Sequence, residues 1–240
     1  MEKIVFKDSN QFRNLIRFLK EFASETTVFI SGNKLIFQSN DVFNKIFLKS
    51  ILEIENTYLE NKNISFNINI LNLYKILLSS NRLSQISFTL NDNQIFFEFK
   101  NKNIIKKSVI SINYKNIDIK DLYTDLKYTI EINTQELYDI LKKCYNISNT
   151  VKINIIKDNI NFISVGDFAS IDIKKNIKFV EDVNLDLFFE LDKLLFACKL
   201  NKISKNLQLN FEEEKPIQIK IFDNNIKIII LLTQKNIENH

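Results

Sequence analysis

Glycine, proline and histidine are scarce in this sequence, and their scarcity excludes several classes of protein. The 240 residues include 2 glycines and 1 proline, which excludes collagen-like, linker-like and proline-rich disordered chains and leaves no glycine-rich phosphate loop. The one histidine is the last residue, His240, so a histidine-activated serine or cysteine nucleophile is not expected. Two distant cysteines and that histidine do not make a zinc site. These absences predict a protein that is not an enzyme and has no cofactor or metal.

Long hydrophobic runs are missing as well. The apolar run at residues 228–232 is far shorter than the roughly 20 residues that span a bilayer, and the first residues lack a hydrophobic segment of secretory length. Cys144 and Cys198 lie within apolar helical patterns, so we expect buried free thiols rather than a disulfide. The sequence therefore predicts an intracellular, reducing location and no membrane partner.

Neither sign of charge dominates the chain. The 33 basic and 29 acidic residues give a net charge of +4, and so small an excess does not by itself indicate nucleic-acid binding. The acidic run at 212–214 falls in an expected hairpin turn, where a solubilising turn is favoured over a metal site. The position of the charges is therefore more informative than their sum.

A unit of strand, helix and two strands joined by a tight turn recurs four times. In the first unit a helix is expected at 9–21 and in the third at 134–144, with weaker copies of the unit around helices at 70–79 and 191–200. One offset aligns Phe12 with Leu137 (137 − 12 = 125) and Ser39 with Ser164 (164 − 39 = 125). The strands are rich in Ile, Val and Phe, and polar Asn/Asp turns separate them.

This repeat predicts an α+β fold of two similar domains, each an antiparallel sheet system with two helices on one face. The expected boundaries are an N-terminal domain at 1–113, a polar interdomain connector at 114–127 and a C-terminal domain at 128–240.

The first helix carries three cations on one side. Phe12, Leu15, Ile16 and Leu19 form its apolar stripe, and a different face carries Arg13, Arg17 and Lys20. Like charges stacked along a helix repel one another, so stability alone does not explain this face. Phosphate binding that is independent of sequence and sensitive to salt would explain it.

The other helices mix both signs of charge, so a solvated charged face remains the alternative interpretation for them. Lys142 and Lys143 lie near Glu136 and Asp139 in the third helix. The remaining cations on or near the second and fourth helices are Lys75, Arg82, Lys193, Lys199 and Lys202.

The four-unit order, the two-half repeat and the length resemble the proliferating cell nuclear antigen (PCNA) family of DNA sliding clamps along essentially the whole chain. The segments that carry this resemblance lie in the same order in both. They are Leu-Ile-Phe-Gln-Ser-Asn-Asp at 35–41, Tyr-Lys-Ile-Leu at 74–77, Lys-Asp-Asn at 157–159, Val-Gly-Asp at 165–167, Lys-Pro-Ile at 215–217 and Leu-Leu-Thr-Gln-Lys at 231–235.

The resemblance implies a DNA-clamp (processivity) fold and a homotrimeric ring that encircles duplex DNA. Such a ring tethers DNA polymerase, the clamp loader and repair enzymes, and it closes by pairing edge strands, here 108–113 and 170–174. The residues expected to face the DNA by position are Arg13, Lys20, Lys75, Lys142 and Lys199. The helical pattern adds Arg17, Lys143, Lys193 and Lys202.

The resemblance also implies a pocket for partner peptides near the connector. Its expected residues are Asn40, Asn44, Phe47, Leu122, Tyr123, Pro216, Leu231 and Leu232. Asn40 and Asn44 replace the family's methionine and histidine, which makes the pocket more polar. Lys157 matches the family's ubiquitin-acceptor position, although an ordinary turn lysine remains the other interpretation.

The sequence pI of about 8.8 departs from the acidic character of the family. We therefore expect a divergent lineage, such as a parasite or a large DNA virus, and a location in the nucleus or, for a cytoplasmic virus, the cytoplasm.

Two other functions remain open. One is a clamp-fold protein that forms no homotrimeric ring: a monomeric processivity factor, a checkpoint-type heterotrimer subunit or a transcription accessory factor. The other is an interaction scaffold with no DNA role, against which the cations of the first helix argue.

Overall fold

The chain folds into two compact units. The computed structural model describes residues 3–41, 45–55, 63–115, 119, 126–177 and 184–235. Unit 1 comprises Met1–Leu122 and Asp223–Ile228, and unit 2 comprises Tyr123–Phe222 and Ile229–His240. The division after Leu122 falls within the segment 114–127 that the sequence marks as a connector.

Unit 1 is a sheet of antiparallel strands with two helices. Its elements are β1 (Lys3–Phe6), α1 (Ser9–Leu19), β2 (Glu25–Ser31), β3 (Lys34–Asn40), β4 (Ile46–Glu55), β5 (Ile64–Asn69), α2 (Ile70–Leu78), β6 (Gln85–Asn91), β7 (Gln94–Asn101), β8 (Ile104–Ser111) and β9 (Asn113–Tyr114). The strand order is β8-β7-β6-β1-β4-β3-β2-β5-β9. Among the described residues β8 therefore has a neighbouring strand on one side only.

Unit 2 repeats this plan with its strands in two groups. Its elements are β10 (Tyr128–Asn133), α3 (Thr134–Tyr145), β11 (Thr150–Ile156), β12 (Asn159–Val165), β13 (Ser170–Asn176), β14 (Asn184–Glu190), α4 (Leu191–Cys198), a 3-10 turn η1 (Lys199–Lys202), β15 (Asn206–Phe211), β16 (Ile217–Asp223) and β17 (Ile226–Leu232). The last residue of β16 and the first three of β17 fall within the segment Asp223–Ile228 of unit 1. The strand orders are β13-β12-β11-β14 and β10-β15-β16-β17. Strand β13 ends its group.

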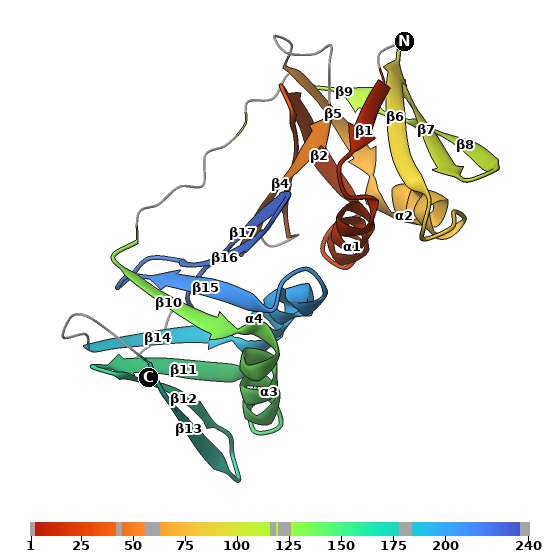
Figure 1. Ribbon diagram of the computed structural model, residues 1–240. Coiled ribbons are helices and arrows are strands. Elements are labelled where there is room, and N and C mark those ends of the chain that lie inside the picture. Colours follow the sequence, from red (N-terminus) through yellow and green to blue (C-terminus); the bar gives the residue numbers. More distant parts are fainter. Residues whose placement is uncertain are drawn as a thin grey trace. The chain divides into compact units, whose positions relative to one another are not determined.

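The two units match element by element. Helices α1 and α3 begin 125 residues apart (134 − 9), and β2 and β11 keep that offset at both ends (150 − 25 and 156 − 31). Pairing repeats as well, because β2 pairs with β3 and β5 while β11 pairs with β12 and β14. Figure 1 shows the two helices of each unit side by side, packed against strands of their own unit. The predicted α+β class with antiparallel sheets is confirmed.

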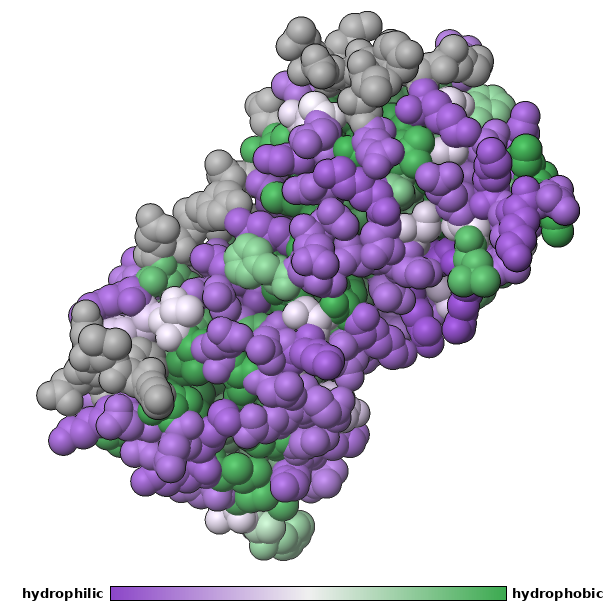
Figure 2. Space-filling model, in the orientation of Figure 1, coloured by the Kyte–Doolittle hydropathy of each residue, from purple (hydrophilic) through white to green (hydrophobic). Residues whose placement is uncertain are grey.

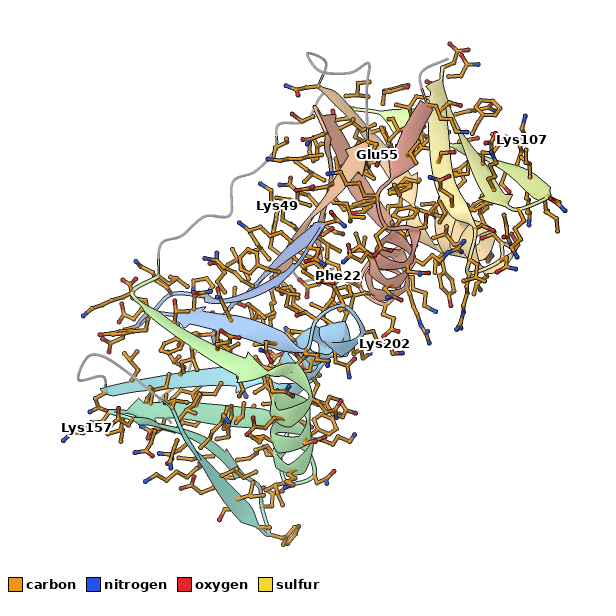
Figure 3. All side chains as sticks on the ribbon, in the orientation of Figure 1. Phe22, Lys49, Glu55, Lys107, Lys157 and Lys202 are labelled. Atoms are coloured by element: carbon orange, nitrogen blue, oxygen red, sulfur yellow. The ribbon has the colours of Figure 1, made fainter. Side chains whose placement is uncertain are left out.

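The first repeating unit has one strand that the sequence did not predict. Strand β4 follows the β2–β3 hairpin. The alternation in β4 is hard to read because Lys49 and Ser50, in its middle, are 4% and 0% exposed; Figure 3 labels Lys49 on this strand. Polar residues inside a buried strand hide the apolar pattern that identifies strands.

Short-range signals explain where the first and third helices begin. Asp8 accepts hydrogen bonds from the backbone N–H groups of Asn10 and Gln11 at 2.8 and 3.1 Å. Asn133, its equivalent in unit 2 (133 − 8 = 125), accepts from Gln135 and Glu136 at 3.0 and 3.1 Å. Such side chains satisfy N–H groups that the first helical turn leaves unpaired, each worth about 1 kcal/mol.

The predicted apolar stripes form the cores of both units. Phe12, Leu15, Ile16 and Leu19 are at most 1% exposed, and the Phe12 ring stacks on Phe6 with centroids 3.9 Å apart. Helix α1 ends at Leu19, two residues before the predicted end. Cys144 and Cys198 are buried free thiols, as the pattern predicted, and burial raises the pKa of Cys198 to about 12.

Tight turns replace glycine with other residues in left-handed backbone conformations. Gly32 has φ +54° in the β2–β3 turn, and the residue 125 positions later, Lys157, has φ +48° in the β11–β12 turn. Asp92 and Lys102 also have positive φ. This conformation is strained for residues that have a Cβ atom. Because the chain has 2 glycines, other residues adopt the strained conformation in its hairpins.

Candidate nucleic-acid interface

The nine cations predicted to face DNA lie on the helices of both units. Unit 1 supplies Arg13 and Arg17 from α1, Lys20 from the position directly after α1, and Lys75 from α2. Unit 2 supplies Lys142 and Lys143 from α3, Lys193 from α4, and Lys199 and Lys202 from η1; Figure 3 labels Lys202. Six of the nine are exposed, and Arg13, Lys20 and Lys193 are half-buried.

The three half-buried cations have partners within the protein. Lys193 forms an ion pair with Glu190 at 2.8 Å, and the ammonium of Lys20 lies 3.9 Å from the centroid of the Tyr74 ring. Arg13 makes the most contacts. Its Nη1 donates to the Leu77 carbonyl and the Ser80 hydroxyl, and its Nη2 donates to the Asn81 carbonyl, each at 2.8 Å.

Arg13 therefore joins α1 to the C-terminal end of α2. Carbonyls in the last turn of a helix have no partner within the helix, and a cation is favourable there because the helix dipole is negative at that end. Burial, followed by repulsion from Arg82, lowers the pKa of the Arg13 guanidinium from its ordinary value. The sequence pattern did not reveal this role, because Arg13 and residues 77–81 are far apart in the chain.

A groove lies between α1 and α2, with a volume of about 280 Å³. Its lining residues are Asn10, Arg13, Asn14, Arg17, Tyr74, Leu77, Leu78, Ser80 and Arg82. Within the described part of unit 1, this lining contains three arginines, no lysine and no carboxylate. The groove therefore holds positive charge that no lining residue neutralises, and the surface over α1 and α2 is mainly hydrophilic (Figure 2).

Arg82 is not among the site residues that the sequence predicted. It lies beyond the end of α2, outside any helical pattern. The available signal was composition: the chain has only three arginines, at positions 13, 17 and 82, and all three line this groove.

The helices of unit 2 present lysines among acidic and amide side chains. Glu136 pairs with Lys175 at 2.6 Å, and Gln135 bonds Asp139 and Asn201 at 2.9 and 3.0 Å. Lys142 and Lys143 are exposed on α3, with the Lys142 ammonium 5.4 Å from the Tyr145 ring centroid. This face offers separate point charges.

The residues predicted to form the peptide pocket fall in different parts of the chain. In unit 1, Asn40 and Phe47 are direct partners across β3 and β4. In unit 2, Pro216 and Leu231 are half-buried, whereas Leu232 is 1% exposed and belongs to the core. Asn44, Leu122 and Tyr123 lie outside the described residues.

Two further predicted features are the candidate modification site and the edge strands. Lys157 lies in the β11–β12 turn, at the end of the hairpin (Figure 3). The predicted edge strands 108–113 and 170–174 correspond to β8 and β13, with somewhat different bounds.

Within the described ranges no cluster of histidine, cysteine, aspartate or glutamate could hold a metal ion. The same residues include no helix long and apolar enough to cross a membrane. No protein-family model matches the chain, and no curated protein matches it.

Proposed function

We propose that this chain is a subunit of a ring-shaped DNA sliding clamp of the PCNA type, a non-enzymatic processivity factor that encircles duplex DNA. The observation that carries the proposal is the internal repeat. The two units share one order of strands and helices, with offsets of 125 residues between their first helices (134 − 9) and 121 between their second (191 − 70). Each unit presents a pair of adjacent helices with exposed cations on them or just after them. Repeated units suit a ring that presents the same kind of surface around a duplex.

The mixture of charges supports sliding rather than fixed binding. Contacts with phosphates do not depend on sequence and weaken with salt. The exposed lysines of α3 share its surface with Glu136 and Asp139, and those of η1 follow α4, which carries Asp192. A weak phosphate surface holds the duplex inside a ring and still lets the ring move along it.

The edge strands β8 and β13 supply a means of closing the ring. Each has a strand neighbour on one side within the described residues, so each has backbone groups available for another chain. Pairing β8 of one subunit with β13 of the next is a head-to-tail contact, which closes when the rotation per subunit fits. Three subunits of two units each give six similar units.

A specific observation favours the alternative of a clamp-fold accessory factor that acts without a homotrimeric ring. Lysine on an edge strand commonly prevents pairing with another chain. Lys107 on β8 and Lys174 on β13 are both exposed, and Figure 3 labels Lys107 on its strand. Pairing of the two edges must bring these like charges close or offset them with other groups.

The family resemblance extends the proposal to partners. A polymerase, a clamp loader and repair enzymes would bind through short peptides at the residues predicted for the pocket, and Lys157 would be the candidate modification site. Its exposed position in a turn suits an enzyme that modifies lysine.

The deciding experiment measures solution mass and topological binding to DNA. We expect light scattering to give three times the 28.4 kDa chain mass, and we expect protein loaded on a nicked circular plasmid to be released when the plasmid is cut. A stable monomer that stimulates a polymerase, with equal retention on circular and linear DNA, would move the assignment to the accessory factor. A monomer that neither binds duplex nor stimulates a polymerase would overturn both.

A further inference from the structure

We infer that the groove between α1 and α2 is a phosphodiester-binding site in which Arg17 and Arg82 contact the phosphate and Arg13 is the positioning residue. The inference rests on the proposed function and refines it, because it implies that the two units of one chain bind the duplex with different strength.

The choice of residue is the first argument. Arginine accounts for 3 of the 33 basic residues, so lysine fills the other 30 (33 − 3). All three arginines nevertheless line this one groove, which contains no lysine among its described residues. Arginine offers a planar pair of N–H donors that matches two phosphate oxygens, whereas lysine offers a point charge. A general demand for positive charge would not separate the two residue types in this way.

The second argument is that the three arginines have different contacts within the protein. Arg13 is held by three hydrogen bonds to the end of α2 and the turn after it. Arg17 and Arg82 are exposed, and in the described part of the chain neither has a hydrogen bond or ion pair. Arg13 therefore ties α1 to the segment that carries Arg82, and the other two guanidinium groups remain available to a ligand.

Electrostatics favours an anion in this place. Arg82 is close enough to Arg13 to disfavour its charged form, and no carboxylate in the lining offsets the three charges. Like charges held together without a counter-charge destabilise the protein. A bound anion offsets this repulsion, so anion binding would also stabilise the folded protein.

The remaining lining residues fit a sugar–phosphate rather than a free phosphate ion. The amides of Asn10 and Asn14 and the hydroxyl of Tyr74 belong to residues that line the groove, and Leu78, in the same lining, is 65% exposed. An exposed leucine beside arginines offers an apolar surface to a deoxyribose. Inorganic phosphate has no part that would use it.

The described part of unit 2 has no arginines at the positions equivalent to Arg13 and Arg17. The 125-residue offset aligns Arg13 with Tyr138 and Arg17 with Lys142. Helices α3 and α4 therefore carry lysines but no arginine, and unit 1 is expected to contact phosphates more strongly and in a more defined geometry.

The chain's composition provides a direct test. Full-length protein labelled with nitrogen-15 on arginine gives one Nε–H signal for each of its three arginines, and single arginine-to-lysine variants assign them. The signals are followed while a short blunt-ended duplex, or inorganic phosphate as the comparison probe, is added. We expect the Arg17 and Arg82 signals to shift with duplex, and to shift much less with inorganic phosphate at the same phosphate concentration.

Duplex affinity is measured in parallel. Arg17→Ala and Arg82→Ala are each expected to weaken binding about tenfold and to reduce the salt dependence by about one phosphate contact. Lys142→Ala, at the position equivalent to Arg17, is the matched control and is expected to weaken binding about twofold.

Two results would overturn the inference: duplex binding with the Arg17 and Arg82 signals unmoved, or shifts that inorganic phosphate produces as strongly as duplex. Equal losses for Lys142→Ala and the arginine variants would also overturn the unequal hold of the two units. Failure of the proposed clamp would look different, because both arginine signals would shift with duplex although no retention specific to circular DNA was seen.

Discussion

Replacing Arg13 with alanine tests whether this cation stabilises the fold or serves only to bind a ligand. The side chain donates hydrogen bonds to the Leu77 carbonyl, the Ser80 hydroxyl and the Asn81 carbonyl, each at 2.8 Å. These bonds connect α1 to the end of α2 across more than 60 residues of sequence. An exposed cation that only binds phosphate would have no such hydrogen bonds to the protein.

The size of the effect follows from what the acceptors retain. The Leu77 carbonyl still accepts from the backbone N–H and the hydroxyl of Ser80, and the Asn81 carbonyl still accepts from the N–H of Ser84. Neither carbonyl is left unpaired, so the change removes net hydrogen bonds of about 1 kcal/mol each without a full desolvation penalty. Partial exposure of the side chain reduces the loss. We expect Arg13→Ala to lower the free energy of unfolding by about 2–3 kcal/mol.

Equilibrium unfolding in urea, followed by circular dichroism, measures this change. Arg17→Ala is the matched control, because it removes the same group one helical turn away, where the described residues offer it no hydrogen bond or ion pair. We expect a change within about 0.5 kcal/mol. Arg13→Lys should fall between wild type and Arg13→Ala, since one ammonium cannot reproduce the planar set of donors. Equal stability of Arg13→Ala and Arg17→Ala would refute the assignment of Arg13 as a positioning residue.

Three further predictions concern the backbone and the thiols. Lys157→Gly should raise the free energy of unfolding by about 1 kcal/mol, and Gly32→Lys should lower it by about as much, because both positions have positive φ; thermal melts of both variants that show no change would contradict this reasoning. Gly166→Ala should destabilise unit 2 by about 2 kcal/mol or more, because the new Cβ would lie 2.3 Å from the Ile147 carbonyl oxygen, and a wild-type unfolding midpoint would contradict it. The pKa of Cys198 is raised from 9.0 to about 12, so the unfolded thiol loses its proton first as pH rises above 9. Stability should therefore fall by about 1 kcal/mol between pH 8 and 10, and Cys198→Ala should reduce this pH dependence; an identical slope in the variant would sink that attribution.

The organisation of the chain can be read from the amino-acid sequence. Helix periodicity identifies the buried stripe of α1, and the 125-residue offset aligns the first half of each unit. These features can be read locally because a helix repeats every 3.6 residues and a strand every two. The predictions that depend on the family resemblance, the ring and its DNA, remain predictions.

The roles of individual polar residues became clear only from the folded structure. It showed Arg13 bound to the end of α2, Lys49 and Ser50 buried within β4, and Leu232 in the core. It also brought Arg82 into the same groove as Arg13 and Arg17. Each of these facts depends on contacts between residues far apart in the chain, and such contacts leave no periodic trace in one sequence. A repeating pattern specifies which side of an element faces the core, whereas the partner of a given side chain is fixed only when the elements pack together.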